Sequence, residues 1–254
     1  MIDIIGGKGF VGSAIVRACQ RSGFAYQTIT RENVDEFTGT ACDILINANG
    51  NSKKYMSERE PLWDFDASVR SVRASLVNIR AGRYVHLSSC DVYPDCSSPE
   101  LTQEDQALDV TGQSAYGFHK YLAELCVMRH APEWLIFRMG GFVGPGLKKN
   151  AIYDILHGGP LWLDPESELQ FINVDEAADI IVSMAASGQY KGIYNLCGTG
   201  TVRLADVIAA AGKPVECKPG SPKTRYEVAT GKLNAHVPVR GTEDAVMEFV
   251  RENR

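Results

Sequence analysis

The chain has 254 residues, enough for one large domain or two small ones, and its 44% hydrophobic and 22% charged residues are typical of a soluble globular protein. A net charge of −5 without a basic block excludes nucleic-acid binding, and no apolar run reaches the ~18 residues of a membrane span. Seven cysteines without CxxC pairs argue against disulfides and metal ligands, and a strand-like start argues against a signal peptide. We expect a cytoplasmic protein that acts on a small-molecule substrate.

The first predicted elements are a strand, Ile2–Ile5, a glycine-rich turn at residues 6–12, and a helical run, Ala14–Cys19. The spacing of three glycines lets the backbone turn sharply, approach a pyrophosphate and direct the helix N-terminus toward it. Glycines also serve other strand-to-helix turns, but the strand and helix on either side favour dinucleotide binding. The residues expected to line this site are Gly6, Lys8, Gly9, Phe10, Val11 and Gly12.

A second strand is predicted at Ala25–Ile29, and Thr30 and Arg31 follow it. An NAD-specific site usually places Asp or Glu here to bind the adenosine ribose. Arg31 cannot accept a hydrogen bond from that ribose, but it can bind a 2′-phosphate, and Lys8 can add a second cation. These residues favour NADP over NAD as the cofactor, with solvated surface charges as the alternative.

The third predicted strand, Asp43–Ala48, follows Thr30 after only about a dozen residues. The segment 31–42 is too short for both an extra strand and a crossover helix, so we predict a parallel sheet without the usual outer strand on this side. Asn47, Ala48 and Asn49 lie where a parallel sheet presents its carboxyl ends to a ligand, and we assign them to the cofactor site.

A helix is predicted at Asp66–Ile79, ended by Gly82, before a buried strand at Tyr84–Leu87. This strand runs into Ser88 and Ser89. Hydroxyls at the carboxyl end of a central strand can hydrogen-bond a substrate carbonyl or alcohol, whereas serine pairs elsewhere are mostly turn residues.

Tyr116 and Lys120 lie four residues apart at the start of an amphipathic run, so they share one face of a predicted helix. An ammonium beside a phenol stabilises the phenolate and lowers its pKa from the ordinary value near ~10. Such a tyrosine can act as a general acid or base. The alternative is a helix that carries both side chains on its surface.

Beyond this helix, a strand is predicted at Trp134–Met139, and the glycine-rich segment 140–146 is a plausible hinge into a smaller lobe. Lys148 and Lys149 are candidates to bind substrate phosphates, with a solvated pair as the alternative. The other predicted elements are helices 152–156, 176–186, 201–211 and 242–250 and strands 171–175 and 194–196, with Asn173 or Asp175 capping the second of these helices.

Five motifs occur in one order: the glycine turn, Ser-Ser-x-x-Val-Tyr at 88–93, Tyr-x-x-x-Lys at 116–120, Arg138 with Val-Gly-Pro-Gly at 143–146, and Phe-Ile-Asn-Val-Asp-Glu-Ala at 171–177. Together they resemble the extended short-chain dehydrogenase/reductases of the NAD-dependent epimerase/dehydratase family, which mostly handle nucleotide sugars. The likeness runs from Met1 to about Pro238.

The resemblance implies an α/β fold with a doubly wound, Rossmann-like parallel sheet that binds NAD(P), and a small C-terminal substrate lobe. It also implies that Tyr116 relays a proton with Ser89 as its hydroxyl partner, and that Lys120 binds the nicotinamide ribose while lowering the pKa of Tyr116. Family analogy predicts a homodimer that pairs helices 66–79 and 114–130. The predicted division is a dinucleotide-binding domain at 1–144 plus 171–190 and a substrate lobe at 145–170 plus 191–254, in one compact unit.

Three departures from the family pattern bear on the reaction. Dehydratases of the family follow the catalytic hydroxyl with Asp-Glu, where this chain has Cys90 and Asp91, so dehydration is disfavoured. Cys90 resembles the epimerising cysteine of GDP-fucose synthases, but one residue is inserted before Tyr93. Gly141 stands where many members have an asparagine that meets the substrate. The candidate substrate-binding residues are Asp91, Gly141, Lys148, Lys149 and Asn150.

The leading functional hypothesis is hydride transfer at a keto or alcohol carbon of a sugar-like, nucleotide-linked substrate by an NADP(H)-dependent reductase or epimerase. A carbonyl reductase for a non-sugar metabolite is a second enzyme hypothesis, which Gly141 and the shortened N-terminal half would favour. A non-catalytic NAD(P)-binding sensor is a third, although binding alone needs no acid–base pair such as Tyr116 and Lys120.

Overall fold

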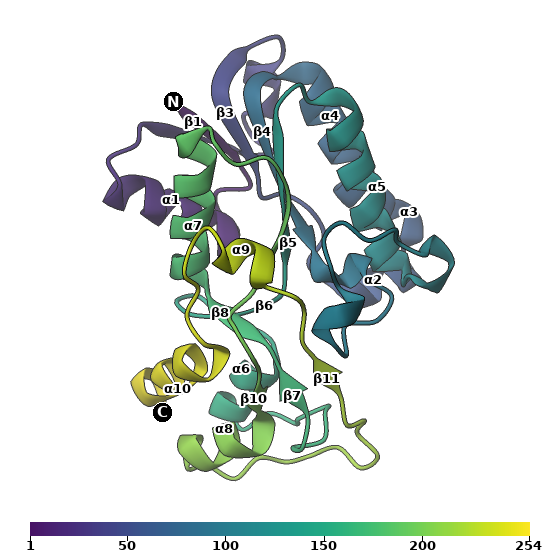
Figure 1. Ribbon diagram of the computed structural model, residues 1–254, viewed down its shortest axis with the longest axis vertical. Coiled ribbons are helices and arrows are strands. Elements are labelled where there is room, and N and C mark those ends of the chain that lie inside the picture. The colour runs from purple at the N-terminus through teal and green to yellow at the C-terminus, as the bar shows by residue number, and fades with distance from the viewer. The chain divides into compact units, whose positions relative to one another are not determined.

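A computed structural model describes all 254 residues, and they form two compact units (Figure 1). The first unit comprises residues 1–94, 107–139 and 178–194, and the second comprises 95–106, 140–177 and 195–254. These units are defined by packing and not by ligand binding, so the assignment of a cofactor domain and a substrate lobe stays a prediction. None of the helices combines the length and the apolar character that a membrane span needs.

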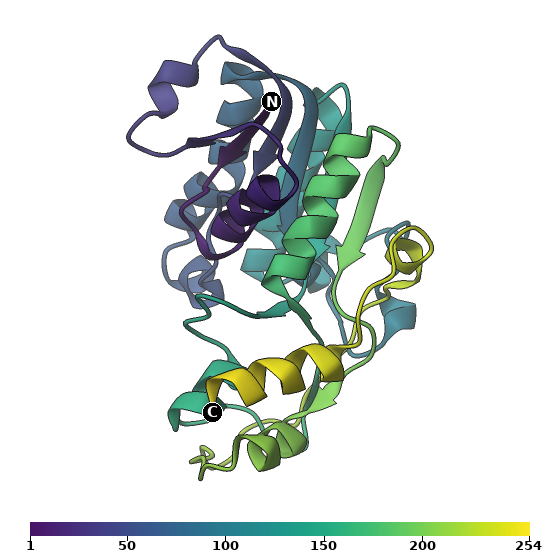
Figure 2. The ribbon, with the colours of Figure 1, turned by 90° about the vertical axis from the view of Figure 1, so that its left-hand side faces the viewer.

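A six-stranded sheet with the order β2-β1-β3-β4-β5-β9 forms the centre of the first unit. Neighbouring strands from β2 to β5 pair in parallel, and the central strands are buried on both faces, as parallel sheets require. Figures 1 and 2 show α1 and α7 on one face of the sheet and α4 and α5 on the other. The predicted α/β, doubly wound fold is therefore confirmed. The strands are β1 (Ile2–Ile5), β2 (Tyr26–Ile29), β3 (Ala41–Asn47), β4 (Arg80–Ser89), β5 (Trp134–Met139) and β9 (Gly192–Leu196), and the principal helices are α1 (Phe10–Arg21), α4 (Ser71–Asn78), α5 (Ala115–His130) and α7 (Val174–Ser187).

The outer edge of the sheet ends at β2, as the short segment 31–42 predicts. Only a 3₁₀ turn, Val34–Phe37, connects β2 to β3, and β3 pairs with the other side of β1. The predicted absence of a further strand is confirmed, because so few residues complete the crossover with a single turn.

The predicted helix at 66–79 is confirmed, as a π-helical turn at 66–70 that continues into α4. Two helices that the sequence did not indicate precede it, α2 (Lys54–Arg59) and α3 (Pro61–Phe65). Pro61 begins α3, where a missing N–H does no harm, and separates it from α2. Gly82 does not end the helix, because it lies within β4, where a Cβ would come 2.9 Å from the Asp43 carbonyl oxygen.

A buried ion pair fixes α5 against the sheet. The Arg138 guanidinium donates to both Glu124 carboxylate oxygens, the shortest contact being 2.8 Å, and to the Tyr93 hydroxyl at 2.9 Å. Ser88 donates to the same carboxylate at 2.5 Å. Glu124 is 0% and Arg138 2% exposed, and the partners match donors to acceptors, which a buried charge needs. This network ties α5 to β4 and β5 one turn after Lys120.

The second unit contains two small sheets and four helices. The parallel pair of β6 (Gly141–Val143) and β8 (Phe171–Asn173) forms one sheet, and β7 (Glu168–Leu169) pairs with β10 (Val202–Arg203) and β11 (Arg225–Tyr226) in the other. Its core consists of apolar side chains such as Ile152, Val207 and Val246. Asn173 caps α7 by accepting from Asp175 N at 2.9 Å, which decides between the two predicted caps. The helices are α6 (Ala151–His157), α8 (Leu204–Ala211), α9 (Gly231–Asn234) and α10 (Thr242–Asn253).

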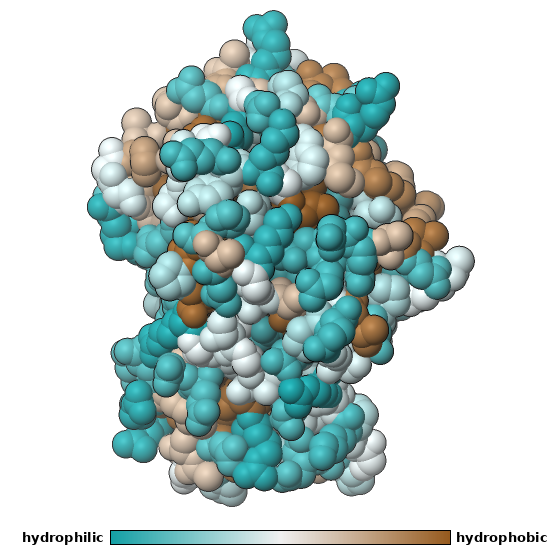
Figure 3. Space-filling model, viewed as in Figure 1, coloured by the Kyte–Doolittle hydropathy of each residue, from teal (hydrophilic) through white to brown (hydrophobic).

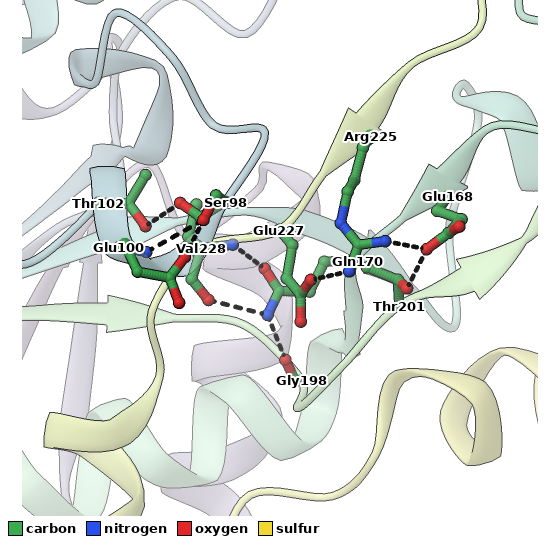
Figure 4. Close-up of polar contacts among 10 residues, drawn as sticks. All are labelled: Ser98, Glu100, Thr102, Glu168, Gln170, Gly198, Thr201, Arg225, Glu227 and Val228. Carbon is green, nitrogen blue, oxygen red and sulfur yellow. Dashed lines mark hydrogen bonds and ion pairs between the residues drawn. The ribbon is translucent and has the colours of Figure 1, made fainter.

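Gln170 is a buried polar anchor of this unit (Figure 4). Its amide nitrogen donates to the Gly198 carbonyl at 2.7 Å and to the Val228 carbonyl at 3.2 Å, and its amide oxygen accepts from Val228 N at 2.8 Å. Arg225 pairs with Glu168 and Glu227 beside it. Because every polar atom of the Gln170 amide has a partner, we interpret it as a structural residue.

Candidate active site

The glycine turn between β1 and α1 is closely packed. Gly6 has a φ of +80°, which favours glycine, and a Cβ at Gly12 would lie 2.1 Å from the Gly6 carbonyl oxygen. No side chain caps α1 at Gly9, and the first turn has no acidic residue. The helix N-terminus thus retains the partial positive charge that attracts a phosphate. These features fit the pyrophosphate of a dinucleotide.

An exposed lysine of this turn lies near an exposed glutamate that follows β2. Lys8 Nζ is 3.7 Å from a carboxylate oxygen of Glu32, the residue after Arg31. Hydrogen bonds from Thr30 and from its own backbone, followed by the Lys8 charge, lower the pKa of Glu32. The sequence interpretation missed Glu32, because it considered only the position directly after β2. This carboxylate and Arg31 make opposite contributions to the choice between a ribose hydroxyl and a 2′-phosphate.

The end of β3 shapes the loop beside the glycine turn. The Asn47 side chain is buried and donates to the Tyr84 hydroxyl at 2.7 Å, while its oxygen accepts from Asn49 N at 3.0 Å. A Cβ at Gly6 would lie 3.0 Å from the Ala48 carbonyl oxygen, so the two loops are in contact. Asn47 therefore acts on the site through the conformation of its loop.

Ser89 and Asp91 lie at the carboxyl end of β4. The Ser89 hydroxyl donates to Asp91 Oδ2 at 2.9 Å and accepts from Asp91 N at 3.2 Å, while Ser88, on the opposite face of the strand, binds Glu124. Asp91 Oδ1 is 2.6 Å from Lys54 Nζ, and the Asp91 side chain is 17% exposed. Lys54, the first residue of α2, is a site residue that the sequence did not indicate, because the polar residues 51–54 show no periodic pattern.

Tyr116 and Lys120 lie together inside the first unit. Ser114 caps α5 by accepting from Gly117 N at 3.1 Å, and the next turns bring Lys120 Nζ to 5.5 Å from the centre of the Tyr116 ring. The side chains are only 8% and 6% exposed, so the surface alternative is wrong. The Tyr116 hydroxyl donates to the main-chain oxygen of Asn51 at 3.2 Å.

The pKa shifts of this pair differ from the expected ones. Burial raises the pKa of Tyr116, the charges of Asp91 and Asp64 raise it further, and only the hydrogen bond with Ser89 opposes them. Burial lowers the pKa of Lys120 to about 8, against the opposing charges of Asp64, Asp91 and Glu124. The expected lowering of the Tyr116 pKa is therefore wrong for this structure, because desolvation of the phenolate dominates. Tyr116 is a neutral proton donor here.

The remaining candidate residues belong to the second unit. A Cβ at Gly141 would lie 2.6 Å from the Phe171 ring, so the structure leaves no room for a side chain there. Asn150 caps α6 by accepting from Tyr153 N at 2.9 Å, and its amide nitrogen donates to the Phe142 carbonyl at 2.8 Å. Its side chain is thus engaged in local structure, while Lys148 and Lys149 precede it in the same loop.

The chain matches known proteins at the level of family and fold. The model of the NAD dependent epimerase/dehydratase family matches residues 2–197, and no curated protein matches the sequence. The structure of MoeE5 in complex with UDP-glucose and NAD has a TM-score of 0.80 at 15% identity, with 99% of this chain and 98% of that chain covered. TunA, an NAD dependent NDP-hexosamine 5,6-dehydratase of tunicamycin biosynthesis, has a TM-score of 0.79 at 21% identity, with 100% and 98% covered. A dTDP-4-dehydrorhamnose reductase from Bacillus anthracis str. Ames in complex with NADP has a TM-score of 0.79 at 18% identity, with 100% and 99% covered.

The parallel sheet and its glycine turn define a Rossmann-like α/β protein that is built to bind a dinucleotide. Because the family model matches most of the chain, the protein belongs to the NAD dependent epimerase/dehydratase family, and it is an oxidoreductase-type enzyme that uses a nicotinamide cofactor. The predicted family is confirmed. The solved structures, which include a dehydratase and a reductase, share its fold at low sequence identity and leave the reaction open.

Proposed function

We propose that this protein transfers a hydride between NADP(H) and a keto or alcohol carbon of a sugar-like, nucleotide-linked substrate. The observation that carries the proposal is the buried Tyr116–Lys120 pair beside Ser89, in the same unit as the glycine turn. The nucleotide-sugar substrate class is supported by structures of this fold with UDP-glucose and by the nucleotide-sugar enzymes among them.

In this proposal each side chain has one task. The glycine turn and the N-terminus of α1 bind the pyrophosphate, and Lys120 binds the nicotinamide ribose. The nicotinamide, when bound, supplies or accepts the hydride. In the reductive direction, Tyr116 turns its hydroxyl from the Asn51 carbonyl and donates its phenolic proton to the substrate oxygen, and Ser89 turns its hydroxyl from Asp91 to donate a hydrogen bond to the same oxygen. The raised pKa of Tyr116 keeps this proton in place until the oxygen gains charge.

The environment of Asp91 favours simple hydride transfer over dehydration or double epimerisation. Those reactions need a base that abstracts a proton next to the carbonyl, and Asp91 is the candidate left by the sequence. Its two oxygens are engaged by the Ser89 hydroxyl and the Lys54 ammonium. We propose that Asp91 holds these two side chains in place and does not act as a base. We assign Asp91 to substrate binding together with Lys148, Lys149, Asn150 and Gly141.

The proposed preference for NADP depends on Arg31 and Lys8. A guanidinium and an ammonium favour the 2′-phosphate, whereas Glu32 repels it and offers an acceptor to a ribose hydroxyl. The Lys8 ammonium, 3.7 Å from Glu32, offsets part of the Glu32 charge. We therefore propose that Arg31, Lys8 and Glu32 together allow the site to bind the 2′-phosphate of NADP.

We also propose a homodimer that forms through α4 and α5. Apolar side chains are exposed on these helices and on the neighbouring α3, and Figure 3 shows brown, hydrophobic residues along this edge. Burying such a surface is the main driving force for association. The exposed side chains include Leu62 at 82%, Val77 at 62% and Leu125 at 41% exposure.

A carbonyl reductase for a non-sugar metabolite is the second candidate, and Gly141 is the observation that favours it. Phe171 fills the space of a side chain at this position, so the chain has no counterpart here of the asparagine that many family members carry. Mass spectrometry of small molecules retained by the purified protein tests both candidates. A retained NADP(H) with a sugar nucleotide supports the first, and a retained metabolite without a sugar supports the second. A protein that retains and binds neither dinucleotide would contradict both.

A further inference from the structure

Asp64, on α3, is a fully buried carboxylate next to the proposed active site. Its Oδ1 accepts from Asn51 Nδ2 at 2.8 Å and from the Ser68 hydroxyl at 3.2 Å, and its Oδ2 is 2.7 Å from His119 Nδ1. Taking a carboxylate out of water costs several kcal/mol unless donors replace the lost hydration. These donors come from three separate segments, so the cluster joins the loop after β3 to α3 and α5.

Asn51 connects this carboxylate to Tyr116. The Asn51 amide is held at both ends, since its nitrogen donates to Asp64 and to the Lys53 carbonyl, while its oxygen accepts from Lys53 N at 2.7 Å. With the side chain fixed, the main-chain oxygen of Asn51 has a defined position, and it accepts the Tyr116 hydroxyl at 3.2 Å. The direction of the phenolic proton thus depends on Asp64.

His119 lies on α5 between Tyr116 and Lys120 in the sequence. Because a carboxylate can only accept, His119 Nδ1 carries the hydrogen of its contact with Asp64. The Phe65 ring packs against the imidazole at 84°, with 5.6 Å between the ring centres, and the His119 side chain is 12% exposed. His119 therefore anchors the Asp64 carboxylate to the helix that carries the proposed acid–base pair.

The charges around Lys120 come from several elements. Asp64 on α3, Asp91 after β4 and Glu124 on α5 raise its pKa, and the neutral, buried His86 of β4 faces it. Asp91 is also paired with Lys54, and Glu124 with Arg138. Asp64 is thus the one carboxylate among the three that no lysine or arginine neutralises in an ion pair.

We propose that Asp64 and His119 form a positioning pair for the active site, which holds the Asn51 carbonyl on the Tyr116 hydroxyl and fixes a buried carboxylate to α5, the helix that carries Lys120. This inference rests on the proposed function, because it takes Tyr116 and Lys120 as the acid–base pair. Neither Asp64 nor His119 needs to touch the substrate.

The test is the titration of Lys120 in the free protein, followed by NMR of ¹³Cε-labelled lysine and assigned with Lys120→Arg. Asp64→Asn keeps the shape of the side chain and removes its charge, so the Lys120 midpoint should fall by about one pH unit or more, as expected when a buried ammonium loses an opposite charge from its surroundings. Ser68→Ala is the matched control, because it removes the hydrogen bond from Ser68 to Asp64 Oδ1 and leaves the negative charge of Asp64 in place. It should leave the midpoint unchanged.

His119 supplies a second comparison that does not require Asp64→Asn to fold. Asparagine places an N–H near the position of Nδ1, so the Lys120 midpoint in His119→Asn should equal that of the wild type. His119→Phe removes the donor that holds Oδ2, whereas Ser68→Ala leaves Asn51 on Oδ1. The carboxylate in His119→Phe can then turn away from α5, and the Lys120 midpoint should shift in the same direction as in Asp64→Asn. A wild-type midpoint in Asp64→Asn, or equal shifts in Asp64→Asn and Ser68→Ala, would overturn the proposal, as would identical midpoints in the two His119 variants. These measurements need no turnover, so a failure of the proposed reaction is detected separately, with the Tyr116→Phe variant.

Discussion

Replacing Lys120 with methionine should stabilise the protein while it removes the proposed function. Lys120 is 6% exposed, and burial lowers the pKa of its ammonium from 10.5 to about 8. One pKa unit corresponds to ~1.4 kcal/mol, so keeping this ammonium charged in the folded protein costs about 3 kcal/mol at neutral pH. Methionine has a similar length and carries no charge. The free energy of unfolding of the variant should therefore exceed that of the wild type by up to about 3 kcal/mol.

The difference in stability between the wild type and Lys120→Met should depend on pH. Below pH 8 the lysine is charged in the folded and the unfolded protein, so the wild type carries the whole cost. Above pH 8 the folded protein releases the proton before the unfolded chain does, because its pKa is the lower one, and the wild type gains stability relative to the variant as the pH rises toward 10.5. The stability difference should thus shrink with increasing pH.

Urea unfolding of both proteins between about pH 7 and pH 9.5, below the range in which most tyrosines titrate, measures this difference. Lys53→Met, a change of an exposed lysine in the loop after β3, is the control and should show a stability difference that does not depend on pH. A Lys120→Met variant that is less stable than the wild type at pH 7, or a difference that stays constant with pH, would refute the reasoning.

Four further predictions test the proposals on reaction, cofactor and assembly. Tyr116→Phe should fold and bind cofactor normally but lose at least ~100-fold in hydride transfer, since only the proton donor is removed, and wild-type turnover would exclude Tyr116 from the site. Arg31→Ala should weaken NADP(H) binding by about 10- to 100-fold in a fluorescence titration and leave NAD(H) binding unchanged, whereas equal wild-type affinities for the two cofactors would contradict the preference. Leu125→Glu should convert a dimer to monomers in sedimentation velocity, and a wild type that is monomeric at micromolar concentration would count against the dimer. A 4-keto sugar nucleotide incubated with the protein in heavy water should gain no deuterium next to its carbonyl, and uptake that disappears in Asp91→Asn would show that the reaction class is wrong.

Local spacing in the sequence determined several features of this protein. Three glycines at intervals of three residues predict the turn between β1 and α1, and a separation of four residues places Tyr116 and Lys120 on one face of a helix. The length of the segment 31–42 predicts the missing strand, because a crossover needs a minimum number of residues. The combined order of the motifs indicates the family. Each single motif consists of residues that are close together in the chain, and the family follows from the order of these motifs.

Only the tertiary structure decided how the site is charged and held. Asp64 lies 55 residues from His119 in the sequence, and Lys54 lies 37 residues from Asp91, so no local pattern indicates either pair. The pKa of Tyr116 is likewise not determined by the sequence pattern. Spacing predicts a lysine beside the phenol, but the sign of the shift depends on desolvation, and desolvation is set by the packing of α5 against β4 and the loop after β3.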